Sequence, residues 1–140
     1  FNLLIGESTA EKIKKEIGTA IPTTNNIFLM KGRDIRTGTP KEIALTEEDA
    51  CEALMPILNQ MLSAIKEALE STPPELSADL VDMGLVLTGG GALLKNIDKL
   101  ISKDTGLPVT IADNPLECVA IGTGKALENE ELFSTMMSEY

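Results

Sequence analysis

Residues 85–101, LVLTGGGALLKNIDKLI, contain the most informative pattern in the sequence. It opens with a short apolar run, continues through Gly89, Gly90 and Gly91, and then carries apolar residues at helical spacing. A continuous apolar run is typical of a strand covered on both faces. The stretch therefore predicts a buried strand, a glycine turn and a single helix that ends near Gly106.

The flanking segments continue this alternation of helix and strand. Residues 72–84 predict a short helix that opens with the capping box TPPE and ends at its glycine. Residues 108–111 predict a second short buried strand, and Asn114 is placed to cap a last helix that ends near residue 128, before an acidic tail that we expect to fray. This order predicts an α/β layer.

The N-terminal third has a different pattern. Ser8 and Glu11 have capping-box spacing, which predicts a helix from Thr9 to Ile17 that ends at a left-handed Gly18. After it, the apolar runs 27–31 and 41–45 are separated by a polar, basic segment. They predict a β-hairpin with a bulge at its first glycine, residue 32, and a positive φ at its second, residue 38.

A long amphipathic helix follows the hairpin. Thr46 is a good N-cap, and the three acidic residues 47–49 suit the positive end of the helix dipole. The acidic run also admits a metal site, although consecutive helical positions do not converge on one ion. An apolar stripe extends to Leu69, and Pro56 inside it predicts a kink or two consecutive helices.

Composition excludes several classes of function. The 140 residues include 12 basic and 22 acidic side chains, for a net charge of −10, and this balance is unfavourable for binding nucleic acid. Histidine is absent, so His-based triads and His metal sites are excluded. The charge is also asymmetric, at +2 for residues 1–45 and −12 for residues 46–140, as two lobes of different surface character would give.

The two cysteines, Cys51 and Cys118, lie in segments that both predict helix. Isolated thiols without a CxxC pattern indicate a reducing compartment, and a disulfide between them stays open as the less favoured alternative. No apolar run approaches the length of a membrane span. The chain begins at Phe1, without Met and inside an apolar run, and we interpret it as one part of a longer protein.

The glycine turn has two interpretations. Bare backbone at the carboxyl end of a strand, followed by a helix N-terminus, is where α/β proteins bind anionic ligands. A tight strand–helix turn with no ligand accounts for the glycines equally well. Two known phosphate motifs are absent: Leu94 stands where GxGxxG needs glycine, and Val119 and Ala126 break a P-loop around Gly124-Lys125.

Several segments together resemble the MreB family of bacterial actin-like, rod-shape-determining proteins. The resemblance rests on LLIGESTAEKIK (3–14), KGRD (31–34), TPPEL (72–76), LTGGGALL (87–94) and PLECVA (115–120), in matching order along nearly the whole chain. It implies an actin-like, ribonuclease H-like α/β half with a small α+β outer subdomain that carries the hairpin. The subdomain would span residues 1–46, the α/β part with the glycine turn residues 47–114, and the closing helix and tail residues 115–140.

The resemblance also implies a site and a function. The protein would bind ATP, form filaments, organise cell-wall synthesis and maintain rod shape. On the first helix, Glu11 and Lys14 lie three positions apart and would share a face, the carboxylate toward ribose hydroxyls and the ammonium toward a purine or phosphate. The nucleotide-binding positions implied are Glu11, Lys12, Ile13, Lys14, Gly89, Gly90, Gly91, Ala92 and Leu93.

Other features of the family would lie outside this segment. The phosphate hairpins, the magnesium-associated acid and the acid that positions water would precede Phe1, so we expect no catalytic residue here and Mg²⁺ bound elsewhere, and polymerisation-linked ATPase activity stays undecided for this segment. The implied partners are further copies in a homopolymer, a RodZ-like membrane-bound adaptor and, through the absent half, the inner membrane surface. Filaments would be cytoplasmic and membrane-associated. The alternative is a sugar-kinase or Hsp70-like ATPase of the same superfamily.

Overall fold

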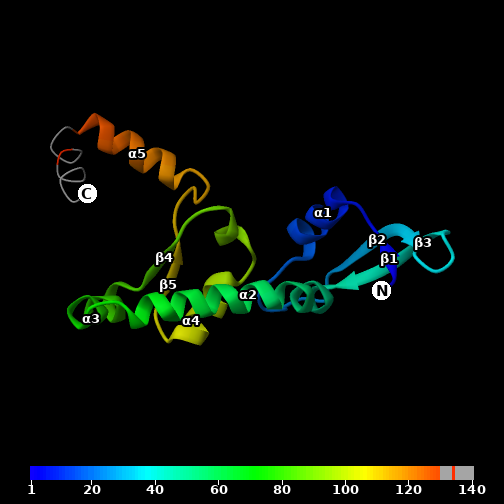
Figure 1. Cartoon of the computed structure of the whole chain (residues 1–140), viewed down its shortest axis with the longest axis horizontal. Coiled ribbons are helices and arrows are strands. Elements are labelled where there is room, and N and C mark those ends of the chain that lie inside the picture. The colour runs from blue at the N-terminus through cyan, green and yellow to red at the C-terminus, as the bar shows by residue number, and fades with distance from the viewer. Residues whose placement is uncertain (130–133, 135–140) are drawn as a thin grey trace.

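The computed structural model describes residues 1–129 and residue 134. Figure 1 shows an elongated arrangement in which the long helix α2 (Glu47–Glu70) connects a hairpin end to an α/β end. The predicted fraying of the acidic tail falls on residues that lie outside the described ones, apart from its first positions. Within the described part, no helix is both long and apolar enough to cross a bilayer.

The hairpin end is a three-stranded antiparallel sheet in the order β1 (Leu3–Leu4), β2 (Ile27–Asp34), β3 (Pro40–Thr46). The predicted positive φ at Gly38 is confirmed, at +74°. The predicted bulge at Gly32 is wrong, because this residue stands opposite Lys41 in an unbroken register. Glycine is needed there for another reason: a Cβ would lie 2.6 Å from the carbonyl oxygen of Leu4, on the neighbouring strand β1.

Helix α1 (Glu7–Ile17) packs on one face of this sheet. It begins two residues earlier than predicted, after Gly6, so Ser8 lies inside the first turn and caps nothing. Gly18 ends the helix as predicted, but with φ −62° and ψ 127° it is extended rather than left-handed. A Cβ at Gly18 would collide with the carbonyl of Lys14, and this close approach is what favours glycine.

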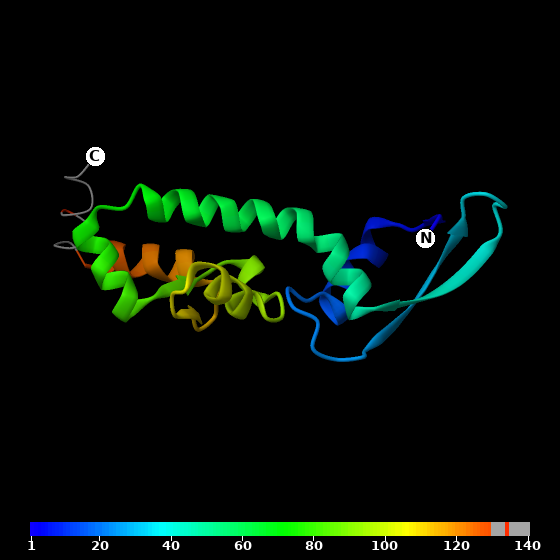
Figure 2. The ribbon, with the colours of Figure 1, turned by 90° about the horizontal axis from the view of Figure 1, so that it is seen from below.

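Helix α2 confirms the predicted start at Thr46. The Thr46 Oγ1 accepts from the Asp49 amide at 3.2 Å, and the Thr46 amide donates to the Asp49 Oδ2 at 2.8 Å, which completes a capping box. Pro56 lies inside one continuous helix, and Figure 2 shows that helix bending within its first half, which confirms the predicted kink.

The α/β end contains α3 (Pro74–Met83), β4 (Leu85–Leu87), a 3-10 turn (Gly90–Leu93), α4 (Ile97–Thr105), β5 (Val109–Ile111) and α5 (Cys118–Glu128). Strands β4 and β5 pair in parallel, as an α/β layer requires. Ala20, Leu58, Ile97 and Ile101 form the core here, and a separate cluster around Met30 forms the core of the hairpin end.

Five local predictions for the α/β end are wrong. Strand β5 was expected to be buried, but none of its residues is buried and Ile111 is 41% exposed. Val86 is 62% exposed, so β4 is covered on one face only within the described residues. The helix predicted after the glycines is split, because Asn96 adopts left-handed angles (φ 60°, ψ 15°) between the 3-10 turn and α4. Neither Thr72 nor Asn114 caps a helix, since α3 begins after Pro73 and α5 begins only at Cys118.

Other predictions for this end hold. Gly84 ends α3 with φ +73°, and Gly106 ends α4 in the left-handed conformation. Both cysteines lie in helices and are free thiols, Cys51 buried in α2 and Cys118 at the start of α5. The three-part division of the chain at residues 46 and 114 stays a prediction.

Candidate functional site

Helix α1 carries the first group of predicted site residues. Glu11 and Lys12 are exposed, while Ile13 is buried against the sheet. The Lys15 ammonium lies 3.1 Å from the Glu11 carboxylate, and this contact, helped by the charge of Lys14, lowers the pKa of Glu11 below its ordinary value. Glu11 is therefore an anion at neutral pH, able to accept hydrogen bonds from hydroxyl groups.

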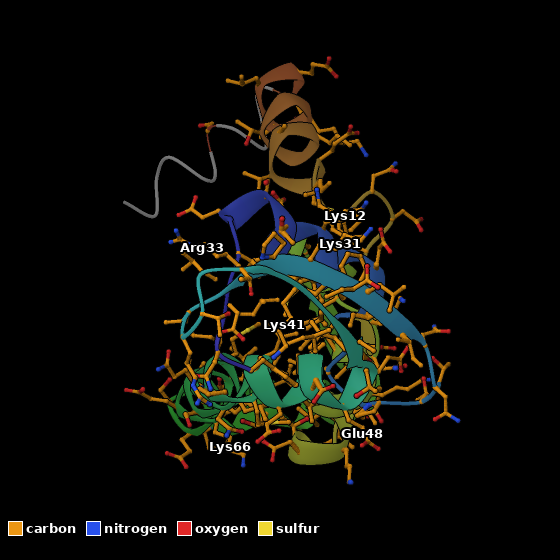
Figure 3. The ribbon with its side chains drawn as sticks, turned by 90° about the vertical axis from the view of Figure 1, so that its right-hand side faces the viewer. Lys12, Lys31, Arg33, Lys41, Glu48 and Lys66 are labelled. Atoms are coloured by element: carbon orange, nitrogen blue, oxygen red, sulfur yellow. The ribbon has the colours of Figure 1, made fainter. Side chains whose placement is uncertain are left out.

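The ion-pair partner of Glu11 is Lys15. Lys14 itself makes no ion pair within 4 Å among the described residues, so its charge is available to an anionic ligand. Lys12 lies 3.9 Å from Glu16, with its nitrogen 6.0 Å from the centre of the Phe28 ring. Figure 3 labels Lys12 together with the basic hairpin residues Lys31, Arg33 and Lys41.

Ile13 and Lys14 also line a cavity of about 260 Å³ between α1, the sheet and the first turns of α2. Its lining is mostly apolar and includes the buried side chains of Met30 and Leu45. An apolar lining suits neither phosphates nor ribose. The buried Ile13 side chain therefore holds α1 on the sheet, and the exposed residues of the helix are left to meet a polar ligand.

The glycine turn supplies the second group. Gly90 and Gly91 are exposed, and their amides have no hydrogen-bond acceptor among the described residues. A Cβ at Gly91 would meet no atom within 4 Å, so the backbone is open to close approach. Ala92 is buried and anchors the turn, whereas Leu93 is 58% exposed. The turn therefore presents free N–H groups, which can donate hydrogen bonds to an anion or to a hydroxyl oxygen of a ligand.

A hydrogen-bonded connector joins α1 to the segment directly after the glycine turn. Thr19 forms an isolated parallel bridge with Lys95, and the Ala20 amide donates to the Lys95 carbonyl at 2.8 Å. The Lys95 ammonium donates to the Glu16 carbonyl at 2.8 Å, on the last turn of α1. Figure 1 shows the consequence, since α1 and the turn that precedes α4 lie on the same side of α2.

The residues that make this junction were not among the sequence-predicted site residues. Thr19 is fully buried, and Asn96 donates from its side-chain amide to the Thr19 Oγ1 at 3.2 Å and to the Ile21 carbonyl at 2.9 Å. These partners are more than 70 positions apart in the chain, so no local pattern links them. The asparagine itself is one signal for this junction. Apart from glycine, Asn is the residue that best tolerates left-handed backbone angles.

A second missed residue is Glu47, interpreted from sequence only as one of three acids at a helix start. It is 2% exposed and accepts from the Thr23 and Thr24 amides at 3.1 and 3.0 Å and from the Thr24 hydroxyl at 2.6 Å. The Thr24 hydroxyl, followed by these two amides, lowers the pKa of Glu47 to about 2. The carboxylate thus fixes the connector between α1 and β2 from its other end.

The fold and this junction together define the class. A small hairpin subdomain and an α/β layer, connected by one long helix and meeting at a glycine turn, are arranged as in the actin-like fold. The MamK double helical filament superposes with a TM-score of 0.62 at 24% identity over 82% of this chain and 35% of its own, which shows the fold alone. MreB 5 of Spiroplasma citri bound to AMPPNP superposes with a TM-score of 0.86 at 34% identity, covering 99% of this chain and 41% of that one.

Within that class, residues 1–135 match the family model of the MreB/Mbl proteins, and the chain belongs to this family. It is 49% identical to the cell shape-determining protein Mbl of Bacillus cereus over 130 residues, which are 92% of this chain and 39% of Mbl. It is 48% identical to the cell shape-determining protein MreB of Escherichia coli over 129 residues, 91% of this chain and 37% of that protein. The chain thus spans about two-fifths of the length of these curated relatives.

Proposed function

We propose that this segment forms the adenosine side of an ATP site in a longer, filament-forming actin-like protein. The observation that carries the proposal is the junction of Thr19 with Lys95, which brings α1 and the glycine turn to one place although they are far apart in sequence. The similarity to MreB 5 structures bound to ADP and AMPPNP supports the choice of ligand.

The residues present are suited to the adenosine part of the nucleotide. In this proposal Glu11 and Lys14 lie toward the ribose and adenine, and the Gly89–Leu93 turn, whose backbone is open at Gly91, lies toward the adenosine and first phosphate. When bound, ATP would supply the phosphoanhydride bond whose hydrolysis alters the filament. Following the resemblance to the MreB/Mbl family, we place Mg²⁺ on residues outside this segment.

Filament formation is the second part of the proposal. Closure of two domains on ATP would favour the stacking of subunits, and hydrolysis would loosen the filament. The hairpin would take part in contacts along the filament, because its outer face carries the exposed apolar side chains Ile27 (61%) and Leu29 (58%) beside the Lys31–Glu42 ion pair. Exposed apolar side chains rimmed by charges are typical of protein–protein contact surfaces.

The cellular role follows by analogy with the relatives named for determining cell shape. We propose filaments that organise cell-wall synthesis and maintain rod shape, cytoplasmic and held at the inner membrane through other parts of the protein and a RodZ-like adaptor. The alternative of a sugar-kinase or Hsp70-like ATPase is not favoured, because the family match extends over residues 1–135 and is specific to MreB/Mbl.

Charge reversal on α1 tests the proposed site. In the full-length protein that carries this segment, Lys14→Glu should weaken ATP binding by roughly tenfold or more, because an attractive charge becomes a repulsive one beside an anionic ligand. Lys99→Glu is the matched control, an equal charge change at an exposed position on α4. Calorimetric titration with ATP measures both, and equal affinities for the two variants would show that α1 does not face the nucleotide.

A further inference from the structure

The connector between α1 and β2, residues 18–26, is held at two points by two different parts of the chain. Its first half is bonded to Lys95 and Asn96, directly after the glycine turn. Its second half is bonded to Glu47, at the start of α2. Because α1 ends where the connector begins, a connector held at both points also fixes the position of α1.

The first anchor depends on the unusual backbone of Asn96. Its left-handed angles, φ 60° and ψ 15°, separate the 3-10 turn from α4 and leave the side-chain amide to donate to Thr19 and Ile21. Asn is favoured here because its short polar side chain tolerates such angles better than other non-glycine residues. One residue therefore sets both the end of the glycine turn and the place of the connector.

Thr19 completes this anchor from the connector side. Its side chain is fully buried, and its Oγ1 lies 2.6 Å from the Ile21 carbonyl and 3.3 Å from the Lys95 carbonyl while accepting from Asn96. A buried hydroxyl that both donates and accepts hydrogen bonds is costly to displace, because its partners would lose those bonds away from water. The anchor is thus a small, closed hydrogen-bond network rather than a surface contact.

We propose that Asn96 is a positioning residue for nucleotide binding, which holds α1 at a fixed separation from the Gly89–Leu93 turn through the connector. This inference rests on the proposed adenosine site. It goes further, because it states that the distance between α1 and the turn is set by a residue whose side chain contacts the connector and not the ligand. The consequence is specific: loss of the Asn96 amide should affect every adenine nucleotide equally, because only the adenosine side moves.

The test uses the full-length protein that carries this segment. Asn96→Asp keeps the shape of the side chain but replaces the amide donor with an acceptor that faces the Ile21 carbonyl. Asn25→Asp is the matched control, with the same chemical change at an exposed position of the same connector. Dissociation constants for ADP and AMPPNP are measured by titration, and melting temperatures are measured without nucleotide.

We expect Asn96→Asp to raise both dissociation constants by roughly tenfold, and by the same factor within about twofold, as the loss of one or two buried hydrogen bonds would give. Asn25→Asp should change neither. A purely structural role for Asn96 would lower the melting temperature and leave the affinity of the folded protein unchanged, and that result overturns the inference. Should the Asp variant fail to fold, Asn96→Gly keeps the left-handed backbone and should still raise both constants, by about threefold.

The two proposals fail in different ways. Wild-type protein that binds neither nucleotide overturns the adenosine site and this inference with it. Wild-type protein that binds both, with Asn96→Gly indistinguishable from Asn25→Asp, overturns the positioning role alone. A loss confined to AMPPNP also overturns it, because that result would place the effect at the terminal phosphate and not at α1.

Discussion

Substitution by alanine should change the free energy of unfolding in opposite directions at two glycines of the same turn, Gly89 and Gly91. Gly89 has φ +81° and ψ 173°, a region of backbone space that is essentially restricted to glycine. Gly91 lies inside the 3-10 turn without a positive φ. At both positions a Cβ would meet no atom within 4 Å, so steric contact with neighbours does not distinguish them. Any difference between the two variants therefore reports backbone conformation alone.

The size of that difference follows from the two conformations. Alanine at Gly89 should destabilise the fold by about 1–3 kcal/mol, the usual strain of a residue held in a glycine-only region. Alanine at Gly91 should stabilise it by about 0.4–1 kcal/mol, because the unfolded chain loses conformational freedom while the folded backbone is compatible. The two unfolding free energies should therefore differ by about 1.4–4 kcal/mol.

Urea denaturation followed by far-ultraviolet circular dichroism measures this difference, since the chain has no Trp and a single Tyr to serve as a fluorescence probe. Gly106→Ala is the control, with φ +74°, no atom within 4 Å of a Cβ and an expected loss of about 1–2 kcal/mol from left-handed strain alone. Equal unfolding free energies for the Gly89 and Gly91 variants would show that the backbone angles of Gly89 do not require glycine. In the full-length protein the Gly91 variant should bind nucleotide more weakly despite its stability, because its methyl group occupies the open face of the turn.

Two further predictions concern the parts that support the site. The pKa of Glu47 is lowered from 4.5 to about 2, so its contribution to stability is fully present above pH 4.5 and is lost as the pH falls toward 2. Glu47→Gln should lower the melting temperature at pH 7 and flatten its decline between those pH values, whereas Glu48→Gln at an exposed position should do neither; parallel pH profiles for the two variants would contradict this. Ile101→Ala, at a side chain only 1% exposed, should cost about 2–5 kcal/mol in urea denaturation. Val119→Ala, at a side chain 76% exposed, should change stability by less than about 0.5 kcal/mol, and similar losses at both positions would show that the core is not centred on α4.

Local signals in the sequence predicted local structure well. Thr46 caps α2, this helix bends in its first half as its proline predicts, and α4 ends at Gly106, because each of these features is decided by a residue and its nearest neighbours along the chain. The order of helices and strands was predictable for the same reason. The family resemblance then supplied the class of fold, which the matches to the MreB/Mbl model and to MreB 5 confirm.

The same capping motif was a poor guide where the preceding backbone disagreed with it. Ser8 has the spacing of a capping box, yet the extended Gly6 starts the helix earlier and turns Ser8 into an interior residue. Thr72 hydrogen-bonds backward to the Ala68 carbonyl at 2.8 Å, so its hydroxyl serves the end of α2 and not the start of α3. A side-chain pattern can satisfy more than one helix end, and the chain on either side decides which.

The candidate site was predictable in its exposed parts and not in the parts that assemble it. Open backbone at Gly91 and charge on α1 are properties of short segments, whereas the contact of Thr19 with Lys95 joins residues 76 positions apart and leaves no periodic trace. Glu47 shows the same limit, because an acid at a helix start has a complete local explanation in the helix dipole. Its burial beneath the connector appears only when Thr24 is brought to it by the fold.

These two anchors make α1 dependent on both ends of the molecule. Glu47 belongs to the helix that leaves the hairpin, and Asn96 belongs to the segment that leaves the glycine turn, yet both bond to one connector of nine residues. A displacement of either end would therefore move α1 and the Glu11 carboxylate with it. A nucleotide that contacts both α1 and the glycine turn would in return stabilise one distance between the hairpin end and the α/β end. It would do so because it binds the conformation with that distance more tightly than the others. In this family, where we propose that domain closure on ATP governs filament assembly, such a connector would couple occupancy of the adenosine side to the relative placement of the hairpin that meets the next subunit.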